Sequence, residues 1–201
     1  PNMLNLKKPH QRVIHSSRFK QSISGITETN NKELKFAVVG GGQSAAEMLL
    51  HLSHAFPNAK IDSIFSSFSY NQSDSSIFTN EVFLNENVDK FYYGNQKVKD
   101  QMILRRTNNA VIDQKELEEL YKLSYEQTYT GERKLNFFNF SKISSITTQD
   151  DAVVLDINNV EHDSYESKSY DYVFLGTGFK ANKLDCLQGV KSYLKEHKGE
   201  Y

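Results

Sequence analysis

The chain has 201 residues, a length that fits one domain or one domain with a small addition. Hydrophobic residues make up 38% of it and charged residues 24%, which is enough for a buried core and excludes wholesale disorder. The formal net charge is -1, so no basic excess exists to attract nucleic acid or an anionic membrane. The single cysteine, Cys186, excludes disulfides and cysteine zinc sites within the chain and fits a cytoplasmic location.

The first part of the chain predicts a linker rather than a folded unit. Residues 1–34 are polar and are interrupted by Pro1, Pro9 and Gly25, with one short extended piece expected at 12–16. No signal sequence is predicted there, because a basic stretch followed by an apolar one is missing. Elsewhere the longest apolar runs are too short to span a bilayer.

Residues 35–65 predict a strand, a glycine turn, a helix and a second strand. Residues 35–39 form a short apolar run rich in β-branched side chains, which is typical of a buried parallel strand. In 43–56 the apolar residues recur every three or four positions, as in an amphipathic helix that ends before Pro57. Residues 60–65 predict the next strand, so the stretch is a βαβ unit.

The remaining elements are less regular. Residues 66–76 predict a surface loop, and 78–93 carry many aromatic side chains without a clear period. Asp113 followed by Glu116 predicts the start of a helix, with Leu117, Leu120, Tyr121 and Ser124 on one side. Alternating patterns predict strands at 134–138, 142–146, 152–157 and 170–175. The expected fold is α/β: a Rossmann-like parallel sheet flanked by helices, with the last strand inside the sheet and a small antiparallel meander on one flank.

The turn between the first strand and the helix carries the strongest chemical signal. Gly40, Gly42 and Ala45 fit the G-x-G-x-x-G/A pattern of dinucleotide-binding turns. Gly40 permits the tight turn, Gly42 lets the backbone approach a pyrophosphate, and Ala45 lets the helix pack on the sheet. The helix N-terminus then faces the phosphates. The alternative is a tight turn with only a structural role.

The end of the second strand favours NADP over NAD. An acid about 20 residues after the first glycine would bind the ribose 2′-hydroxyl of NAD, but Ser66 and Ser67 stand there. Hydroxyls can accept a 2′-phosphate that a carboxylate would repel. Lys60, Arg105 or Arg106 could supply the missing positive charge, or could equally be solvated surface residues.

Three helix residues offer a rival site. Glu47, His51 and His54 follow one another at i, i+4 and i+7, a spacing that zinc would accept. Such residues are also ordinary on the solvent-facing side of a helix.

Five segments, taken in order, resemble the flavin-dependent N-hydroxylating monooxygenases of siderophore biosynthesis, which are the ornithine N5- and lysine N6-monooxygenases. The turn at 40–47 is similar to their NADPH-binding turn. The other four segments are Arg12–Ser17, Phe78–Tyr92 with its "F-x-N-E-x-F … V-D-x-F-Y" pattern, Thr107–Ile112, and Asp171–Phe179, which resembles the "A-T-G-Y" signature. This order across residues 12 to 179 is more specific than any single segment.

The resemblance implies cofactors, a reaction and site residues. In the family NADPH reduces FAD, and the reduced flavin uses O2 to hydroxylate the side-chain amine of ornithine, lysine or a related diamine. Gln43 and Ser44 correspond to residues that contact NADPH. Asn80 and Asn108 correspond to the asparagines that hold the amino-acid substrate. For Asn80 the alternative is a loop asparagine that hydrogen-bonds its own backbone.

The sequence also departs from the family pattern. Ser66 stands where an arginine often binds the 2′-phosphate, Asn109 replaces a tyrosine, and Gly176 and Phe179 replace the alanine and tyrosine of the signature. The separate glycine fingerprint for FAD is missing. We therefore expect an NADP(H)-binding domain at 35–180, an entry segment at 1–34 and a tail at 181–201, both leading to a missing FAD domain.

Two other functions remain open at this stage. The chain could be the NADP(H)-binding domain of another flavoprotein oxidoreductase, or a non-catalytic dinucleotide-binding module. The missing Cys-x-x-Cys argues against a disulfide reductase. A homo-oligomer is possible by analogy with the family.

Overall fold

The computed structural model describes residues 10–26, 33–104, 110–149, 151–179, 189 and 193. A parallel sheet of five strands has the order β1-β8-β2-β3-β4. Its strands are β1 (Val13–His15), β2 (Lys35–Val39), β3 (Lys60–Ile64), β4 (Leu135–Phe138) and β8 (Tyr172–Leu175). An antiparallel sheet contains β5 (Ser141–Gln149), β6 (Ala152–Asn159) and β7 (Ser164–Tyr170). The predicted fold class is confirmed.

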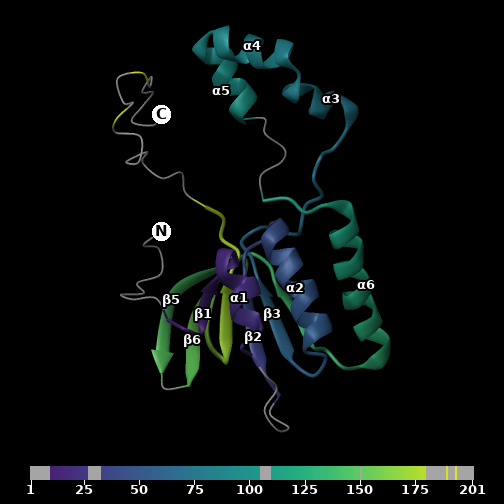
Figure 1. Ribbon diagram of the computed structural model, residues 1–201. Coiled ribbons are helices and arrows are strands. Elements are labelled where there is room, and N and C mark those ends of the chain that lie inside the picture. The colour runs from purple at the N-terminus through teal and green to yellow at the C-terminus, as the bar shows by residue number, and fades with distance from the viewer. Residues whose placement is uncertain are drawn as a thin grey trace.

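The parallel sheet is the middle of three layers (Figure 1). Three helices pack on one face: α1 (Phe19–Ile23), which follows the short 3-10 turn η1 (Ser16–Arg18), α2 (Gln43–Ala55) and α6 (Gln114–Thr130). The antiparallel sheet packs on the other face. Each face of the parallel sheet therefore has its own apolar core.

Strand alternation sends neighbouring side chains into these two cores. Phe36 and Val38 pack with the helices, whereas Ala37 between them packs with the antiparallel sheet. The same alternation in β3 turns Asp62 toward the antiparallel sheet and Ser63 toward the opposite side, where its hydroxyl contacts Tyr70. All the residues of β3 after Lys60 are buried.

Asp62 is the main polar link between the two sheets. It is 8% exposed and accepts hydrogen bonds from the Tyr170 hydroxyl at 2.9 Å and from Asn136 Nδ2 at 2.9 Å. Lys168 Nζ lies 3.5 Å from the same carboxylate and 4.1 Å from the centre of the Phe138 ring. Burial and the Asp62 charge raise the pKa of Tyr170, so this tyrosine stays a neutral donor.

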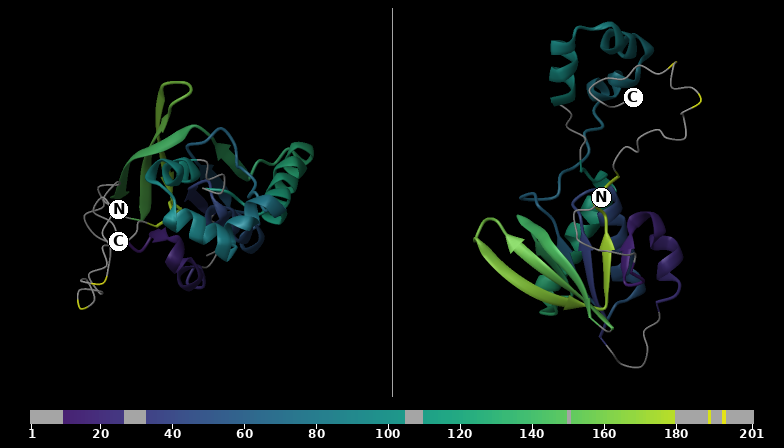
Figure 2. Two further views of the ribbon diagram at one scale, coloured as in Figure 1. Left: turned by 90° about the horizontal axis from the view of Figure 1, so that it is seen from above. Right: turned by 90° about the vertical axis from the view of Figure 1, so that its left-hand side faces the viewer.

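A helical arm projects beyond the sheet edge at which β3 ends. It contains α3 (Ile77–Asn80), the 3-10 turn η2 (Glu81–Phe83), α4 (Asn85–Tyr93) and α5 (Gln96–Leu104). It stands apart from the layers in Figure 1 and in the right-hand view of Figure 2. Many of its apolar side chains are exposed, among them Ile77, Phe78, Phe83, Leu84, Val88, Tyr92 and Tyr93. In α4 the apolar residues Val88, Phe91 and Tyr92 recur at helical spacing, although this helix was not predicted from the sequence.

The arm joins the layers through two neighbouring segments. Gln72 and Ile112 form a parallel bridge, with Ile112 N donating to Asn71 O at 2.9 Å and Ser73 N donating to Ile112 O at 2.8 Å. Ser73 Oγ also donates to Asp113 Oδ1 at 3.0 Å. The chain therefore enters and leaves the arm side by side, at one narrow base.

Several expectations need correction. The entry segment is not simply a linker, because β1 pairs with β8 and Phe19 of α1 is buried in the helix-side core. Strand β7 was not predicted, since its residues are mostly exposed. Helix α6 begins after Asp113 as expected, but the Asp113 side chain makes no capping hydrogen bond and Tyr121 is 72% exposed. Strand β4, which was expected in the antiparallel meander, belongs to the parallel sheet.

Removing the Asp62 carboxylate should destabilise the contact between the sheets. We expect Asp62→Ala to lower the free energy of unfolding by about 2–4 kcal/mol, because it leaves the buried Tyr170 hydroxyl and the Asn136 amide without their acceptor. Urea denaturation followed by circular dichroism measures this loss. Asp156→Ala is the control, since that carboxylate accepts bonds only from serines near the surface. Equal losses in the two variants would contradict the prediction.

Candidate functional site

The carboxyl ends of β2 and β8 form the topological switch point of the parallel sheet, the place where the direction of the strand order reverses. From β2 the chain continues to β3 and β4 on one side, whereas β8 on the other side comes from the end of the described chain. In open α/β sheets, ligands bind in the crevice at such a point. Gly40 follows β2 and Gly176 follows β8, so the predicted turn lies where the topology favours a ligand.

Gly40 is required by a close approach of backbones. Its φ is +142°, and a Cβ at this position would lie 2.3 Å from the carbonyl oxygen of Gly176. Gly40 N donates to Ile64 O at 2.9 Å, and Gly176 N donates to Val39 O at 2.7 Å. The ends of β2, β3 and β8 are thereby held together around the turn.

Gly42 also lies in a tight place, but next to a segment that the sequence did not predict there. A Cβ at Gly42 would lie 3.3 Å from Cα of Ala110, which itself has a positive φ of 54°. The segment that returns from the helical arm thus packs against the turn. Contact between Gly42 and a pyrophosphate stays a prediction.

Gln43 connects the turn to the base of the arm. Its Oε1 accepts a hydrogen bond from Asp113 N at 2.8 Å, and its Nε2 donates to Glu47 Oε1 at 3.1 Å. The carboxamide therefore already has protein partners. A contact between Gln43 and cofactor stays a prediction, and the backbone N–H at the helix start is the group best placed for it.

The first turn of α2 suits an anion. Gly42 is the N-cap and offers no side chain to the free N–H groups, and the first turn, which is fully described, contains no acidic residue. Ser44 is exposed there, while Ala45 is completely buried against the sheet, as predicted for close helix packing. A Cβ added to Gly176 would lie 3.1 Å from the Ala45 methyl carbon, which shows how close this packing is.

Ser66 and Ser67 lie directly after β3, beside the turn. Ser67 Oγ is 3.6 Å from the position that a Cβ on Gly41 would take, and it donates to Ser69 O at 2.9 Å. Ser66 is exposed. Lys60 is excluded as the positive charge that would help these serines bind a 2′-phosphate. It stands at the start of β3, whereas the serines follow the end of that strand, and it pairs with Glu33 at 2.9 Å. Arg105 and Arg106 lie outside the described residues.

Of the two predicted substrate asparagines, the structure describes only Asn80. Asn80 ends α3 on the helical arm, is exposed, and donates from Nδ2 to Ser75 O at 3.1 Å. This is the backbone-binding alternative for a loop asparagine. Asn108 and the neighbouring Asn109 lie outside the described residues. Their roles stay predictions.

The rival metal site gains no support. Among the described residues, no three His, Cys, Asp or Glu side chains are grouped to hold a metal ion. Glu47 is bonded to Gln43, His51 packs on the Phe19 ring at 5.4 Å, and His54 lies 3.5 Å from Glu119. Within the same described part, no helix has the length and apolar composition to cross a membrane.

A cavity of about 270 Å³ lies at the other edge of the sheet. It is lined by residues near the end of α2 and the start of β4, including Phe56, Ile61 and Leu135. Gln127 closes one side, where its Oε1 accepts from Lys134 N and Leu135 N. This cavity is separate from the glycine turn.

Comparison with known proteins decides the family. The family model described as L-lysine 6-monooxygenase/L-ornithine 5-monooxygenase matches residues 1–181. The chain belongs to this family. An L-ornithine N(5)-monooxygenase of Pseudomonas aeruginosa is 26% identical over 98% of the chain and 45% of its own length. The chain thus spans about half the length of such a monooxygenase.

Solved structures of this monooxygenase family share the fold. The reduced form of ornithine hydroxylase from Pseudomonas aeruginosa has a TM-score of 0.85 at 27% identity, covering 98% of this chain and 47% of that one. The ornithine N-hydroxylase of Kutzneria, in a structure with reduced FAD, NADP+ and L-ornithine, has a TM-score of 0.78 at 28% identity, covering 85% and 41%. The L-lysine 6-monooxygenase of Pseudomonas syringae has a TM-score of 0.79 at 26% identity, covering 94% and 46%.

Because Gly40 lies so close to the Gly176 carbonyl, adding one methyl group at Gly40 should destabilise the fold. We expect Gly40→Ala to lower the free energy of unfolding by about 3 kcal/mol or more, because its Cβ collides with the Gly176 carbonyl and its φ is strained. Gly41→Ala is the matched control, since its Cβ would make ordinary contacts. Thermal unfolding of both variants measures the difference. A stable Gly40→Ala protein would contradict the geometry described for the turn.

Proposed function

We propose that the chain is the NADPH-binding part of a flavin-dependent monooxygenase that hydroxylates the side-chain amine of L-ornithine, L-lysine or a related diamine. The observation that carries this proposal is the position of the Gly40–Ala45 turn, at the switch point between β2 and β8. Family membership supplies the reaction class. The monooxygenase activity belongs to the longer protein, with an FAD domain and O2 as further partners.

The residues at the turn fit the cofactor. The N-terminus of α2 provides N–H groups at Gln43 and Ser44, and its first turn adds no negative charge against a pyrophosphate. Ser66 and Ser67 place hydroxyls beside the turn, at the end of the second βαβ strand, where the adenosine ribose of a dinucleotide lies. No carboxylate stands at that strand end, which favours a 2′-phosphate.

The role of the chain in the reaction follows from that fit. Bound NADPH supplies a hydride to the flavin. Gly40, Gly42 and Ala45 shape the turn, the N–H groups at Gln43 and Ser44 hold the pyrophosphate, and the two serines bind the 2′-phosphate. Asn80 and Asn108 are proposed to contact the amine substrate. Because Asn80 lies on the arm, this role requires the arm to lie against the rest of the full-length protein.

Three further features belong to this proposal. The cofactor domain comprises 35–180 together with β1 and α1, which belong to its sheet and its core. The protein acts in the cytoplasm, and it forms a homo-oligomer. The choice among ornithine, lysine and a diamine is made by residues that line the amine pocket in the full-length enzyme.

A carboxylate at the helix start tests cofactor binding without disturbing the fold. We expect Ser44→Asp to weaken NADPH binding about tenfold or more, because the new charge repels the pyrophosphate. The same charge favours the helix N-terminus, so thermal stability should stay equal or rise. Isothermal titration calorimetry with NADPH and NADH measures binding, and wild-type protein should prefer NADPH.

The control is Ser169→Asp, which adds the same charge to an exposed serine of β7, away from the turn. It should leave NADPH affinity unchanged. Equal weakening by both variants would attribute the effect to net charge and contradict the assigned site. Wild-type protein that binds neither nucleotide, or both equally, would refute the proposed cofactor.

A further inference from the structure

The loop that carries Ser66 and Ser67 is fixed firmly at its two ends. At the first end, Phe65 N donates to Phe138 O at 3.0 Å and Ser141 N donates to Phe65 O at 2.9 Å. At the second end, the Tyr70 hydroxyl bonds to Ser63 Oγ and its ring stacks on Phe65, with centroids 4.4 Å apart. Burial raises the pKa of Tyr70 to about 12, so this bond persists at neutral pH. Residues 66–69 lie between these two anchored ends.

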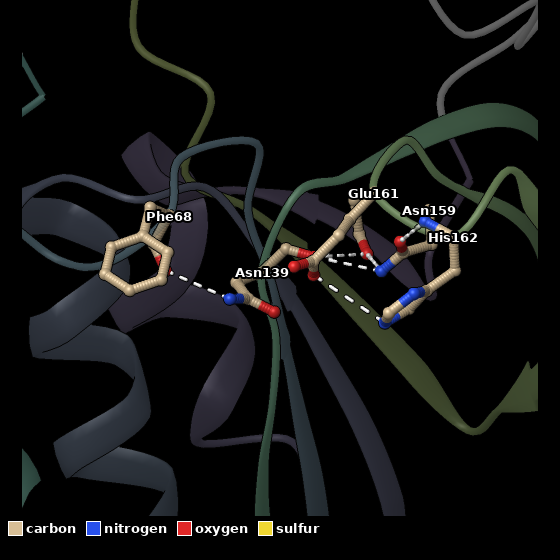
Figure 3. Close-up of polar contacts among 6 residues, drawn as sticks. Phe68, Asn139, Asn159, Glu161 and His162 are labelled. Atoms are coloured by element: carbon tan, nitrogen blue, oxygen red, sulfur yellow. Dashed lines mark hydrogen bonds and ion pairs between the residues drawn. The ribbon is translucent and has the colours of Figure 1, made fainter.

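The middle of the loop is held by the corner between β4 and β5. Asn139 Nδ2 donates to Phe68 O at 3.1 Å, a contact seen in Figure 3. The next residue of the corner, Phe140, donates from N to Ser67 O at 3.1 Å, and its ring lies 5.8 Å from that of Phe68. Of these three contacts, only the one from Asn139 is made by a polar side chain.

The corner is itself anchored in the antiparallel sheet. Asn139 O accepts from Asn159 Nδ2 at 3.2 Å, and Asn159 Oδ1 accepts from His162 N at 3.0 Å (Figure 3). Phe140 has a positive φ of 49°, and its carbonyl accepts from Val160 N at 2.9 Å. The corner is therefore a rigid support, and the loop rests on it.

We infer that Asn139 is a positioning residue for cofactor selectivity, which holds Ser66 and Ser67 where they meet the 2′-phosphate of NADPH. This inference rests on the proposed function. Asn139 touches no part of the cofactor and acts through Phe68 O. Its hydrogen bond fixes the middle of the loop, and the Ser67 hydroxyl is thereby kept beside Gly41. Through the corner at Asn139, the antiparallel sheet thereby contributes to recognition of the cofactor.

If Asn139 has this role, its removal should lower the affinity for NADPH but not the affinity for NADH. Asn139→Ala should weaken NADPH binding about fivefold, the worth of one hydrogen bond, and leave NADH binding unchanged. NADH lacks the 2′-phosphate, so it does not depend on the loop hydroxyls. Calorimetric titration of the 201-residue chain with each nucleotide measures both affinities. A merely structural role would weaken NADPH and NADH together, and that result would overturn the inference.

The matched control is Asn158→Ala. Asn158 precedes Asn159 in the same strand, and its Nδ2 donates to the Tyr165 hydroxyl at 3.2 Å, away from the loop. The Asn158→Ala protein should bind NADPH and NADH with the same affinities as the wild type. Asn139→Leu, a neutral change of similar size that removes the donor, covers the case in which the alanine variant does not fold. It should show the same selective loss.

A double-mutant cycle tests the route through the loop. In a protein that already carries Ser66→Ala and Ser67→Ala, adding Asn139→Ala should no longer change NADPH affinity, because the groups that it positions are gone. A further loss in that background would overturn the inference. If wild-type protein does not prefer NADPH to NADH, the proposed function fails. If the ratio of NADPH to NADH affinity is the same in Asn139→Ala as in the wild type, the inference alone fails.

Discussion

The backbone contact between Gly40 and Gly176 is the constraint around which the rest of the protein is arranged. The two glycines end neighbouring parallel strands, and the space between them admits no Cβ. Because β2 and β8 come from distant parts of the chain, this contact joins the βαβ unit to the C-terminal part of the described fold. The crevice of the sheet therefore opens at a fixed place, and α2 begins with its N–H groups directed at it.

Two layers support that crevice in different ways. The helix side is a continuous apolar core, in which Phe36, Leu49 and Leu52 are fully buried. The antiparallel side combines an apolar cluster with polar links, namely Asp62 to Tyr170 and Asn139 to the loop after β3. Apolar packing is non-directional and holds the layers together, whereas hydrogen bonds have preferred distances and angles and so fix the position of a loop. The polar links are thus suited to position the groups beside the turn.

The helical arm is coupled to the turn at its base rather than along its length. Gln43 accepts from Asp113 N, Ala110 packs on Gly42, and the bridge between Gln72 and Ile112 holds the two connecting segments together. The predicted cofactor turn therefore contacts the base of the predicted substrate arm directly. Asn80 lies farther out, among the exposed apolar side chains of the arm.

The sequence by itself determined the βαβ unit, the glycine turn and the family. Periodicity and glycine spacing are local properties, so 35–39, 43–56 and 60–65 could be assigned without coordinates. The arm helices, β7 and the pairing of β1 with β8 were decided only by tertiary structure. Strand β7 is mostly exposed and β1 has three residues, so neither carries a clear alternating signal. The arm helices were not predicted, although α4 repeats apolar residues at helical spacing. The contacts of Gln43 with Asp113, of Asp62 with Tyr170 and of Asn139 with Phe68 likewise join residues at least 70 positions apart, and no local pattern encodes such contacts.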